Sequence, residues 1–598
     1  MLILVDLIVY MYYVYTAFMA SIQSKISRGN KYWYIVESKR VNGKPRPIVL
    51  EYLGKPDDLL RRLRGLADSI KIKSYSHGAV AALLNIAAEL DIVPIINKYI
   101  NSPRSYTAKK PLRNNLTAGA TYLLGSIGRV CMPTSKLSWW QWAKETSLQY
   151  LLSAALSKID SQHFWDLMDA LPEDAIEKIE CEILQKVMEK FAISHDSLFY
   201  DTTNFFTFIH TTNSKCTIAQ RGKNKQKRYD LRQVGMALVV TRQDLIPLFH
   251  HTYQGNMNDA KVFGQVIKKI KTRMETLGLD LEKHSLVFDR GNNSKANMAM
   301  IKKLGGIHYV GALTPYHNKQ LIADADEKYE DIDLGDDQYM RVYRDKREIW
   351  GEERTVLIYV SRGLKSGQIR GIYQNLEKKK KQLKELKDDL LNPRAKSKTE
   401  EGLTKKIQGI VKGQFITGVI DWHLTQKQEG KFTLDFSINE KKLQEVEDKM
   451  GFRILMTDRH QWSSAEIIKA YLGQSKVEYA FKNTKNPYHI AFRPQFHWTD
   501  QKIKVHYFMC ILGYLLTTLV QYKVKSKKAF EGNIDNLLDR LNEIRLTTLL
   551  EESDTPGRIK SIHKLEEMDD EQQNIMQALE INDYHVTRPK LNGLSVYN

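Results

Sequence analysis

Three acidic residues lie at positions that could form one site. Two of them are at the predicted ends of strands, and the third is on the polar face of a predicted helix. Asp201 and Asp289 each follow a short apolar run, LFY and LVF, and Glu478 lies in a helical stretch. Carboxylates held close together repel one another unless a cation lies between them, and all-oxygen ligands suit Mg²⁺ or Mn²⁺. Two such ions about 3.5–4 Å apart activate a water or a 3′-hydroxyl and stabilise the leaving oxygen of a phosphodiester. Any one of these acids alone is better explained as a cap of a strand or loop, whereas the three together favour a site for two ions.

The helix that carries Glu478 is predicted as a single element from Ser463 to Lys485. Ser463 forms a capping box with the glutamate three residues later, and Asn486-Pro487 ends the helix just after its last turn. At about 100° per residue, four polar side chains of this helix fall on one stripe. They are Tyr471, Gln474, Glu478 and Lys485. A solvated surface face is the alternative interpretation of this stripe, and the acids upstream favour a site.

The acids lie in a region that alternates strands and helices. From residue 191 the pattern predicts three strands, a helix over Asp259–Leu277, a strand ending at Asp289, a helix from near Ser294 and a further strand, IHYVGAL. This is the order of an RNase H-like α/β core, with an acid at its first and fourth strands. The final helix of that core comes only after a long interruption. The predicted fold is therefore an RNase H-like catalytic core split by a β-rich and helical insertion.

The whole chain of 598 residues is too long for one hydrophobic core, so several modules are expected. They are an apolar leader over 1–20, a small β-hairpin module over 21–75, a helical DNA-binding region over 76–190, the first part of the core over 191–313, the insertion over 314–450, the second part of the core over 451–525 and a helical tail over 526–598. In the hairpin module Asn42-Gly43 marks the turn. Its basic and aromatic residues leave two interpretations open, a DNA-contacting ribbon and a solvated edge.

Two apolar runs invite a check for membrane segments. Residues 1–20 are long enough to cross a bilayer, but Asp6 interrupts them and no basic segment or cleavage site marks a signal peptide. Because Met19 opens an ordinary soluble start, we expect translation to begin there. The second run, Tyr507–Val520, has the length of a buried core helix, so no membrane partner is expected.

The charge of the chain points to a polyanionic partner. The net charge is +20 and the pI is near 9.3, a balance typical of proteins that bind nucleic acid. The segment between the first two predicted strands is rich in basic residues, for which contact with a DNA backbone is favoured over a solvated loop. They are Arg221, Lys223, Lys225, Lys227, Arg228 and Arg232. The four cysteines form no CxxC pair, which argues against a zinc site or disulfide framework and fits a reducing cytosol.

Taken in order, these motifs resemble the DDE transposases of bacterial and archaeal insertion sequences. YDTT at 200–203, VFDRG at 287–291 and the spacing Tyr471-x2-Gln474-x3-Glu478-x6-Lys485 carry the resemblance. The most similar branch, in the insertion-sequence-four-like superfamily, has a Y-x2-R-x3-E-x6-K signature and a β-rich insertion before its catalytic Glu. The resemblance runs from about residue 31 to beyond residue 545. Each motif alone is weak, whereas the ordered set with matched spacing is specific.

The resemblance implies a role for each of these residues. Asp201, Asp289 and Glu478 would hold two Mg²⁺ or Mn²⁺ ions, and Tyr471 and Lys485 would contact phosphates near the cleaved bond. Gln474 stands where the signature has Arg, and a Gln lacks the charge and the bidentate fork that an Arg offers to phosphate. Lys482 lies on the same side of the helix and could replace part of that contact.

The implied function is metal-dependent cleavage of DNA and strand transfer in cut-and-paste transposition. The implied partners are double-stranded DNA, as terminal inverted repeats and as target, and a second copy of the chain on that DNA. The implied location is the cytoplasm of a prokaryote, in association with the nucleoid. Two alternatives stay open: a related metal-dependent endonuclease without strand transfer, and a decayed or domesticated DNA-binding protein. A tyrosine recombinase would need an ordered set of Arg and His around a nucleophilic Tyr, and the sequence has no such set.

Overall fold

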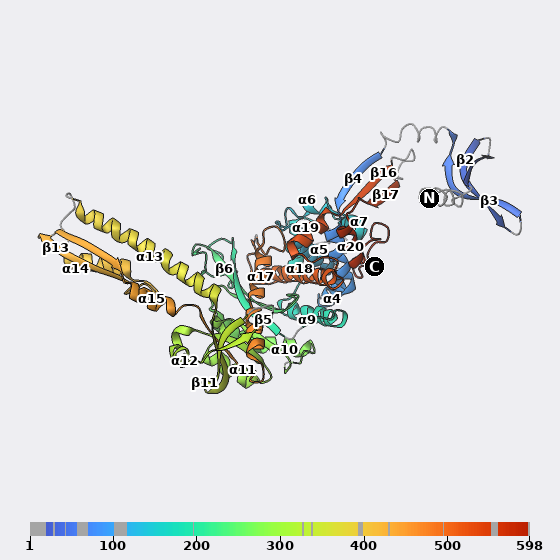
Figure 1. The fold of residues 1–598 in the computed structure, drawn as a ribbon. Coiled ribbons are helices and arrows are strands. Elements are labelled where there is room, and N and C mark those ends of the chain that lie inside the picture. The colour runs from blue at the N-terminus through green and yellow to red at the C-terminus, as the bar shows by residue number, and fades with distance from the viewer. Residues whose placement is uncertain are drawn as a thin grey trace, which may run out of the picture.

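A large β-sheet with parallel and antiparallel strands forms the centre of the computed structural model (Figure 1). The structure describes residues 20–27, 30–41, 44–56, 70–100, 116–194, 197–280, 282–325, 328–335, 339–392, 399–428, 431–493, 495–551 and 560–595. In these ranges nine strands pair in the order β10-β11-β12-β15-β9-β8-β5-β6-β7. The predicted apolar leader therefore lies outside the described residues, apart from Ala20.

The half of the sheet from β9 to the edge strand β7 contains the elements predicted from the apolar runs, in the predicted order. Its strands are β5 (Ser197–Thr207), β6 (Arg232–Thr241), β7 (Pro247–Gln254), β8 (Ser285–Phe288) and β9 (His308–Leu313), with α10 (Asp259–Thr276), η1 (Arg290–Asn292) and α11 (Lys295–Leu304) between them. β5, β6 and β7 are antiparallel, and β5, β8 and β9 are parallel. Parallel strands need long crossovers, which α10 and α11 provide. Phe263 of α10 packs against both Tyr200 and Phe288, so this helix covers the strands that carry the acids.

The first part of the predicted insertion extends this sheet instead of forming a separate unit. After η2 (Pro315–His317) and α12 (Lys319–Asp324) come β10 (Glu330–Asp333), β11 (Tyr339–Ile349) and β12 (Glu352–Val360). β12 pairs antiparallel with β15 (Phe452–Thr457), which pairs with β9. Residues 354–359 of β12 are buried, so side chains on both faces of this strand are covered. Such burial is typical of a strand inside a sheet.

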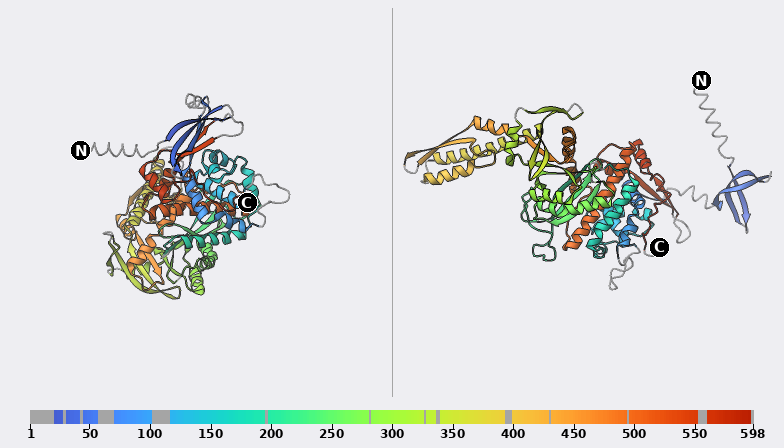
Figure 2. Two further views of the ribbon diagram at one scale, coloured as in Figure 1. Left: turned by 90° about the vertical axis from the view of Figure 1, so that its right-hand side faces the viewer. Right: turned by 90° about the horizontal axis from the view of Figure 1, so that it is seen from below.

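The second part of the insertion is an arm with its own hydrophobic core. It consists of α13 (Arg362–Leu391), α14 (Glu400–Val411), β13 (Ile420–Gln428), β14 (Lys431–Ile438) and α15 (Glu440–Asp448). Leu376, Leu383, Ile407 and Leu434 are among the side chains buried within it. Figures 1 and 2 both show this arm projecting from the sheet. The helical part of the predicted insertion is present as α13, α14 and α15.

The predicted helical region over 76–190 is helical and packs around one long buried helix. The surrounding helices are α3 (Gly78–Glu89), α4 (Ile92–Lys98), α5 (Ala118–Cys131), α6 (Trp139–Ala143), α7 (Leu148–Leu152), α8 (Ser161–Met168) and α9 (Glu173–Lys190). The central helix is α18 (Asp500–Ser526). In the described part of the chain it is long and apolar enough to span a membrane, as is the bent pair α3 and α4 taken together, but 94% of its apolar stretch is buried in the protein. That burial is typical of a core helix.

Besides the β13–β14 pair of the arm, two three-stranded sheets lie outside the central one in the described part of the chain. The first contains the predicted hairpin, β2 (Asn30–Val41) and β3 (Lys44–Gly54), with β1 (Ala20–Ser27) added at one edge. The second joins β4 (Ile70–Ser76) to β16 (Arg545–Glu551) and β17 (Lys560–Leu565). The tail over 526–598, predicted as helical, therefore holds strands as well as α19 (Ile534–Glu543) and α20 (Asp570–Ala578). The segment RLTTLLE becomes a strand because β4, far away in the sequence, pairs with all seven of its residues.

Candidate active site

Asp201 and Asp289 are neighbours on two parallel strands. Tyr200 of β5 pairs with Phe288 of β8, so each acid is the residue that follows a paired position. Because neighbouring strands are about 4.8 Å apart, the two carboxylates start from adjacent points of the sheet. Asp201 accepts a hydrogen bond from the N–H of Thr202 at 2.7 Å, and Asp289 accepts one from the N–H of the following arginine at 2.7 Å.

Two helices, and not the predicted single helix, position Glu478. The first, α16 (Ser464–Leu472), begins with the predicted capping box: the hydroxyl oxygen of Ser463 accepts from the N–H of Glu466 at 3.2 Å, and the Glu466 carboxylate accepts from the N–H of Ser463 at 2.7 Å. The second, α17 (Ser475–Lys485), carries Glu478 and ends at the predicted position. The prediction of one helix from Ser463 to Lys485 is therefore wrong at its centre.

The break between α16 and α17 has a packing cause. At Gly473 and Gln474 the chain makes a tighter turn, in which the N–H of Gln474 donates to the carbonyl of Tyr471 at 2.9 Å. A Cβ atom at Gly473 would lie 2.5 Å from the ring of Phe199 on β5. Only glycine allows this close approach of the helix to the strand.

Contacts at both ends of α17 fix its course along one face of β5. Before the helix, Gly473 lies against the ring of Phe199. At the other end, the ammonium of Lys485 donates a hydrogen bond to the hydroxyl of Thr203. Alternate residues of a strand point to the same face, so Phe199, Asp201 and Thr203 share a face of β5. Glu478 lies between the two helix contacts. The structure therefore brings all three predicted acids to one region of the sheet.

Burial and the neighbouring carboxylates both act on the pKa of Asp201. The pKa of Asp201 is raised from 3.8 to about 7, chiefly by burial and further by the charges of Asp289, Asp259 and Glu478, while the hydrogen bond from Thr202 opposes the rise. Nearby negative groups disfavour ionisation of a carboxyl group, and a divalent cation would relieve the repulsion.

Asp259 belongs to this group of acids although the sequence reasoning missed it. It is the first residue of α10, and its carboxylate accepts a hydrogen bond from the hydroxyl of Thr202 at 2.7 Å. Its position follows from the end of β7 and the N-cap at Asn258, which begin the helix beside the acid-bearing strand. An acid in the first turn of a helix after a strand was the signal in the sequence, but helix-dipole stabilisation explains that pattern equally well.

Tyr471 and Lys485, predicted as DNA contacts, also touch the acidic strands. The hydroxyl of buried Tyr471 donates to the Asp289 carboxylate at 3.3 Å, and the guanidinium of Arg453 lies 5.8 Å from the centre of the tyrosine ring. Burial, helped by the charges of Lys225 and Arg493, lowers the pKa of Lys485 to about 8. Each side chain thus lies beside an acid-bearing strand and within the influence of a basic residue.

The remaining predicted DNA contacts fall into two groups. Gln474 is half-buried in the turn between the helices, and Lys482 is exposed with its ammonium 5.9 Å from the ring centre of Tyr479. The loop between β5 and β6 carries five of the six basic residues, and Arg221, Lys223, Lys225 and Lys227 are exposed on it; Arg232 is the first residue of β6.

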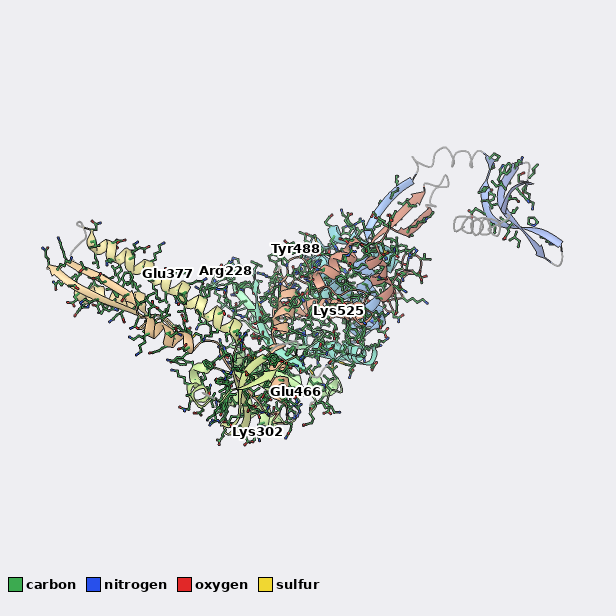
Figure 3. The ribbon with its side chains drawn as sticks, in the orientation of Figure 1. Arg228, Lys302, Glu377, Glu466, Tyr488 and Lys525 are labelled. Atoms are coloured by element: carbon green, nitrogen blue, oxygen red, sulfur yellow. The ribbon has the colours of Figure 1, made fainter. Side chains whose placement is uncertain are left out.

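The other two of these six basic residues have partners within the protein. The guanidinium of Arg228, labelled in Figure 3, pairs with the Asp230 carboxylate through contacts of 2.7 and 2.8 Å. Arg232 donates to the backbone carbonyls of Thr211 and Asn213 at 2.6 and 2.9 Å. These two arginines therefore shape the loop, whereas the exposed cations around Lys225 form its free basic surface.

The donor set suits a hard divalent ion. Its members, Asp201, Asp259, Asp289 and Glu478, offer only carboxylate oxygens, the ligands that Mg²⁺ and Mn²⁺ prefer. Among the residues that the structure describes, no three His, Cys, Asp or Glu side chains are close enough together to hold an ion as they stand. Side-chain rotation at the exposed acids Asp289 and Glu478 would have to close the group around an ion.

Comparison with known proteins gives one family-model match, over the N-terminal part of the chain. Residues 20–76 match the family model described as IS1634 family transposase, N-terminal domain. This match supports a transposase. Among solved structures, a piggyBac transposase synaptic complex with hairpin DNA is similar at 8% sequence identity, over 77% of this chain and 79% of that chain, with a TM-score of 0.37. No protein of curated function matches the chain. The matched range covers β1 to β4 and ends before the acid-bearing sheet.

Proposed function

We propose that the protein is a DDE transposase of an insertion sequence, with an RNase H-like core in which Asp201, Asp289 and Glu478 hold two Mg²⁺ or Mn²⁺ ions. The observation that carries the proposal is the convergence of the three acids. Two follow paired positions on adjacent parallel strands, and the third lies on a helix fixed along the same face of β5. When bound, divalent ions supply activation of a water or 3′-hydroxyl and stabilisation of the leaving oxygen.

The other residues of the site have supporting roles. Tyr471 orients the Asp289 carboxylate through its hydroxyl, and Asp259 orients Thr202, whose N–H contacts Asp201. Lys485 and the exposed lysines of the β5–β6 loop bind phosphates of the DNA backbone. Gln474 stands in place of the arginine of the family signature, and the guanidinium of Arg453, 5.8 Å from the ring centre of Tyr471, offers a positive charge beside that tyrosine.

The proposed partners are double-stranded DNA and a second copy of the chain. The DNA takes part as the terminal inverted repeats of the element and as the target, in agreement with the net charge of +20. Coordinated cleavage of two ends requires two active sites, so a homodimer on DNA is the simplest assembly. The proposed location is the cytoplasm of a prokaryote, in association with the nucleoid.

The experiment is cleavage and strand transfer on DNA that carries the terminal repeats of the element, in Mg²⁺ or EDTA. The unmodified protein is compared with Asp201→Ala, Asp289→Ala and Glu478→Ala, and with Glu445→Ala as a matched exposed helix acid in the arm, outside the site. We expect metal-dependent cleaved and joined products that disappear in the three site variants, while DNA binding persists. Cleavage without joined products would instead identify a nuclease, and binding without cleavage by the unmodified protein would identify a DNA-binding protein.

A further inference from the structure

An arginine beside the group of acids has no partner for its charge. Arg453 is half-buried on β15, with its guanidinium 5.8 Å from the centre of the Tyr471 ring. Among the residues that the structure describes, this guanidinium forms no ion pair and donates no hydrogen bond. A guanidinium is not deprotonated in proteins. The free protein therefore holds a permanent and unpaired positive charge at this point.

Other arginines of the same sheet have partners within the protein. Arg341 of β11 pairs with Asp331 at 3.7 Å. On the same strand, Arg347 pairs with Asp345 at 2.7 Å. On β12, Arg354 donates to the hydroxyl of a tyrosine on β9. These three arginines are used to hold the sheet together, whereas the arginine of β15 is free to bind a ligand.

The face of the sheet around Arg453 has more hydrogen-bond donors than acceptors. Tyr359 of β12 pairs directly with Arg453, and directly opposite residues of an antiparallel pair point to the same face. Burial raises the pKa of Tyr359 to about 12, and the charge of Arg453 opposes the rise. The buried hydroxyl of Tyr359 has no hydrogen-bond partner among the described residues. An unpaired guanidinium next to an unpaired hydroxyl favours a ligand that brings acceptor atoms and negative charge.

This face lies at the edge of the sheet that carries the acids. The residue after Arg453 pairs with Leu313, the last residue of β9, and β9 runs parallel to β8, which ends just before Asp289. Tyr471 connects the two positions, because its hydroxyl donates to the Asp289 carboxylate at 3.3 Å. On the other side of the acids, Lys485 contacts β5. Two cationic side chains therefore flank the acids along the sheet, one beyond β8 and one at β5.

We propose that Arg453 binds one backbone phosphate of the DNA strand next to the bond that is cleaved, on the β15 side of the acids. The guanidinium donates two N–H groups to two phosphate oxygens, a bidentate geometry that arginine provides and lysine does not. Such a contact positions the strand on the protein and reads no sequence. The alternative, a purely structural contact with the Tyr471 ring, would leave the charge unpaired. The inference rests on the proposed function, because it needs DNA as the substrate at the acids.

The test removes the charge from each side of the contact in turn. Arg453→Met keeps the apolar stem beside Tyr471 and removes the guanidinium. In a duplex that carries the terminal repeat, each phosphate near the cleaved bond is replaced in turn by a neutral methylphosphonate. Binding to the full-length protein is measured in EDTA, which separates binding from metal-dependent cleavage.

We expect Arg453→Met to bind the natural duplex about tenfold more weakly, the effect of losing hydrogen bonds to a charged group. The slope of log affinity against log salt should fall by about 0.9. One methylphosphonate position should cost the unmodified protein about the same tenfold and cost Arg453→Met nothing further, because two changes to one contact are not additive.

Two further variants separate charge from structure. Arg453→Lys should keep the salt slope and lose part of the affinity, because lysine retains the charge without the bidentate fork. Arg341→Met is the matched control, since it removes an exposed arginine of the same sheet whose charge is already paired. It should leave both affinity and slope nearly unchanged. Thermal unfolding of Arg453→Met should match that of the unmodified protein.

Equal affinity and equal salt slope for Arg453→Met and the unmodified protein would overturn the inference. Additive losses at every methylphosphonate position would overturn it as well, because they would show that Arg453 acts indirectly through Tyr471. Cleavage in Mg²⁺ is measured on the same preparations. Absence of cleavage by the unmodified protein would refute the transposase, whereas the binding comparison would still decide whether Arg453 binds a phosphate.

Discussion

Binding of Mg²⁺ by the three acids is expected to displace a proton from Asp201 below pH 7. In the absence of metal, burial and the neighbouring carboxylates raise the pKa of this side chain to about 7, so it is mostly protonated at pH 6 and mostly ionised at pH 8. A carboxyl group must be ionised to bind a metal ion. The release should therefore be about 0.9 proton per chain at pH 6, about 0.5 at pH 7 and about 0.1 at pH 8.

The release can be measured by isothermal titration calorimetry in two buffers that differ in ionisation enthalpy. Asp201→Asn should abolish it, because the amide has no proton to lose in this range. Asp244→Asn is the matched control, since burial also raises the pKa of Asp244 but its carboxyl lies outside the site. The control should release as many protons as the unmodified protein.

The same pKa makes a second, metal-free observation possible. A carboxyl whose pKa is raised on folding destabilises the folded state as the pH rises from about 4 to about 7, and each pKa unit corresponds to about 1.4 kcal/mol. Asp201 would thus account for a loss of about 4 kcal/mol over this range in EDTA, and Asp201→Asn should reduce that loss. The reasoning would be refuted if Mg²⁺ bound at pH 6 without proton release, or if Asp201→Asn released protons equally.

Further predictions concern the helix break and the basic surface. Gly473→Ala should destabilise the protein by about 1–3 kcal/mol through the contact with Phe199; thermal unfolding would show it, and Phe199→Leu in the same chain should restore part of the loss. Because the pKa of Lys485 is about 8, its charge is present below that pH and lost above it; DNA affinity should fall between pH 7 and pH 9, and less so in Lys485→Arg. Lys225→Ala should reduce the slope of log affinity against log salt by about 0.9, and Arg228→Ala, whose charge is already paired, by less.

The placement of Asp201 and Asp289 could be predicted because it depends on local sequence. Each acid ends an apolar run of the length of a buried strand, and the helices between the runs imply parallel pairing. The capping box at Ser463 was equally local. Glu478 was harder, because only the spacing of polar residues along its helix distinguished it from a solvated surface acid.

What the sequence did not reveal depends on contacts between distant segments. The break at Gly473 exists because a ring on β5 occupies the space of a side chain there. The extension of the sheet depends on β12 meeting β15, a strand beyond the whole arm. The structural role of Arg232 depends on the carbonyls of Thr211 and Asn213. These lie in an irregular loop, whose course the hydrophobic periodicity of the sequence does not predict.

Metal rescue at Asp289 tests the central claim most directly, because it asks whether this carboxylate holds an ion. Asp289→Cys replaces an oxygen ligand with sulfur, which Mn²⁺ accepts more readily than Mg²⁺. We predict that Asp289→Cys is inactive in DNA cleavage with Mg²⁺ and regains activity with Mn²⁺, while Asp289→Ala is inactive with both. Full activity of either variant in Mg²⁺, or equal inactivity of both in Mn²⁺ while the unmodified protein cleaves, would contradict the account.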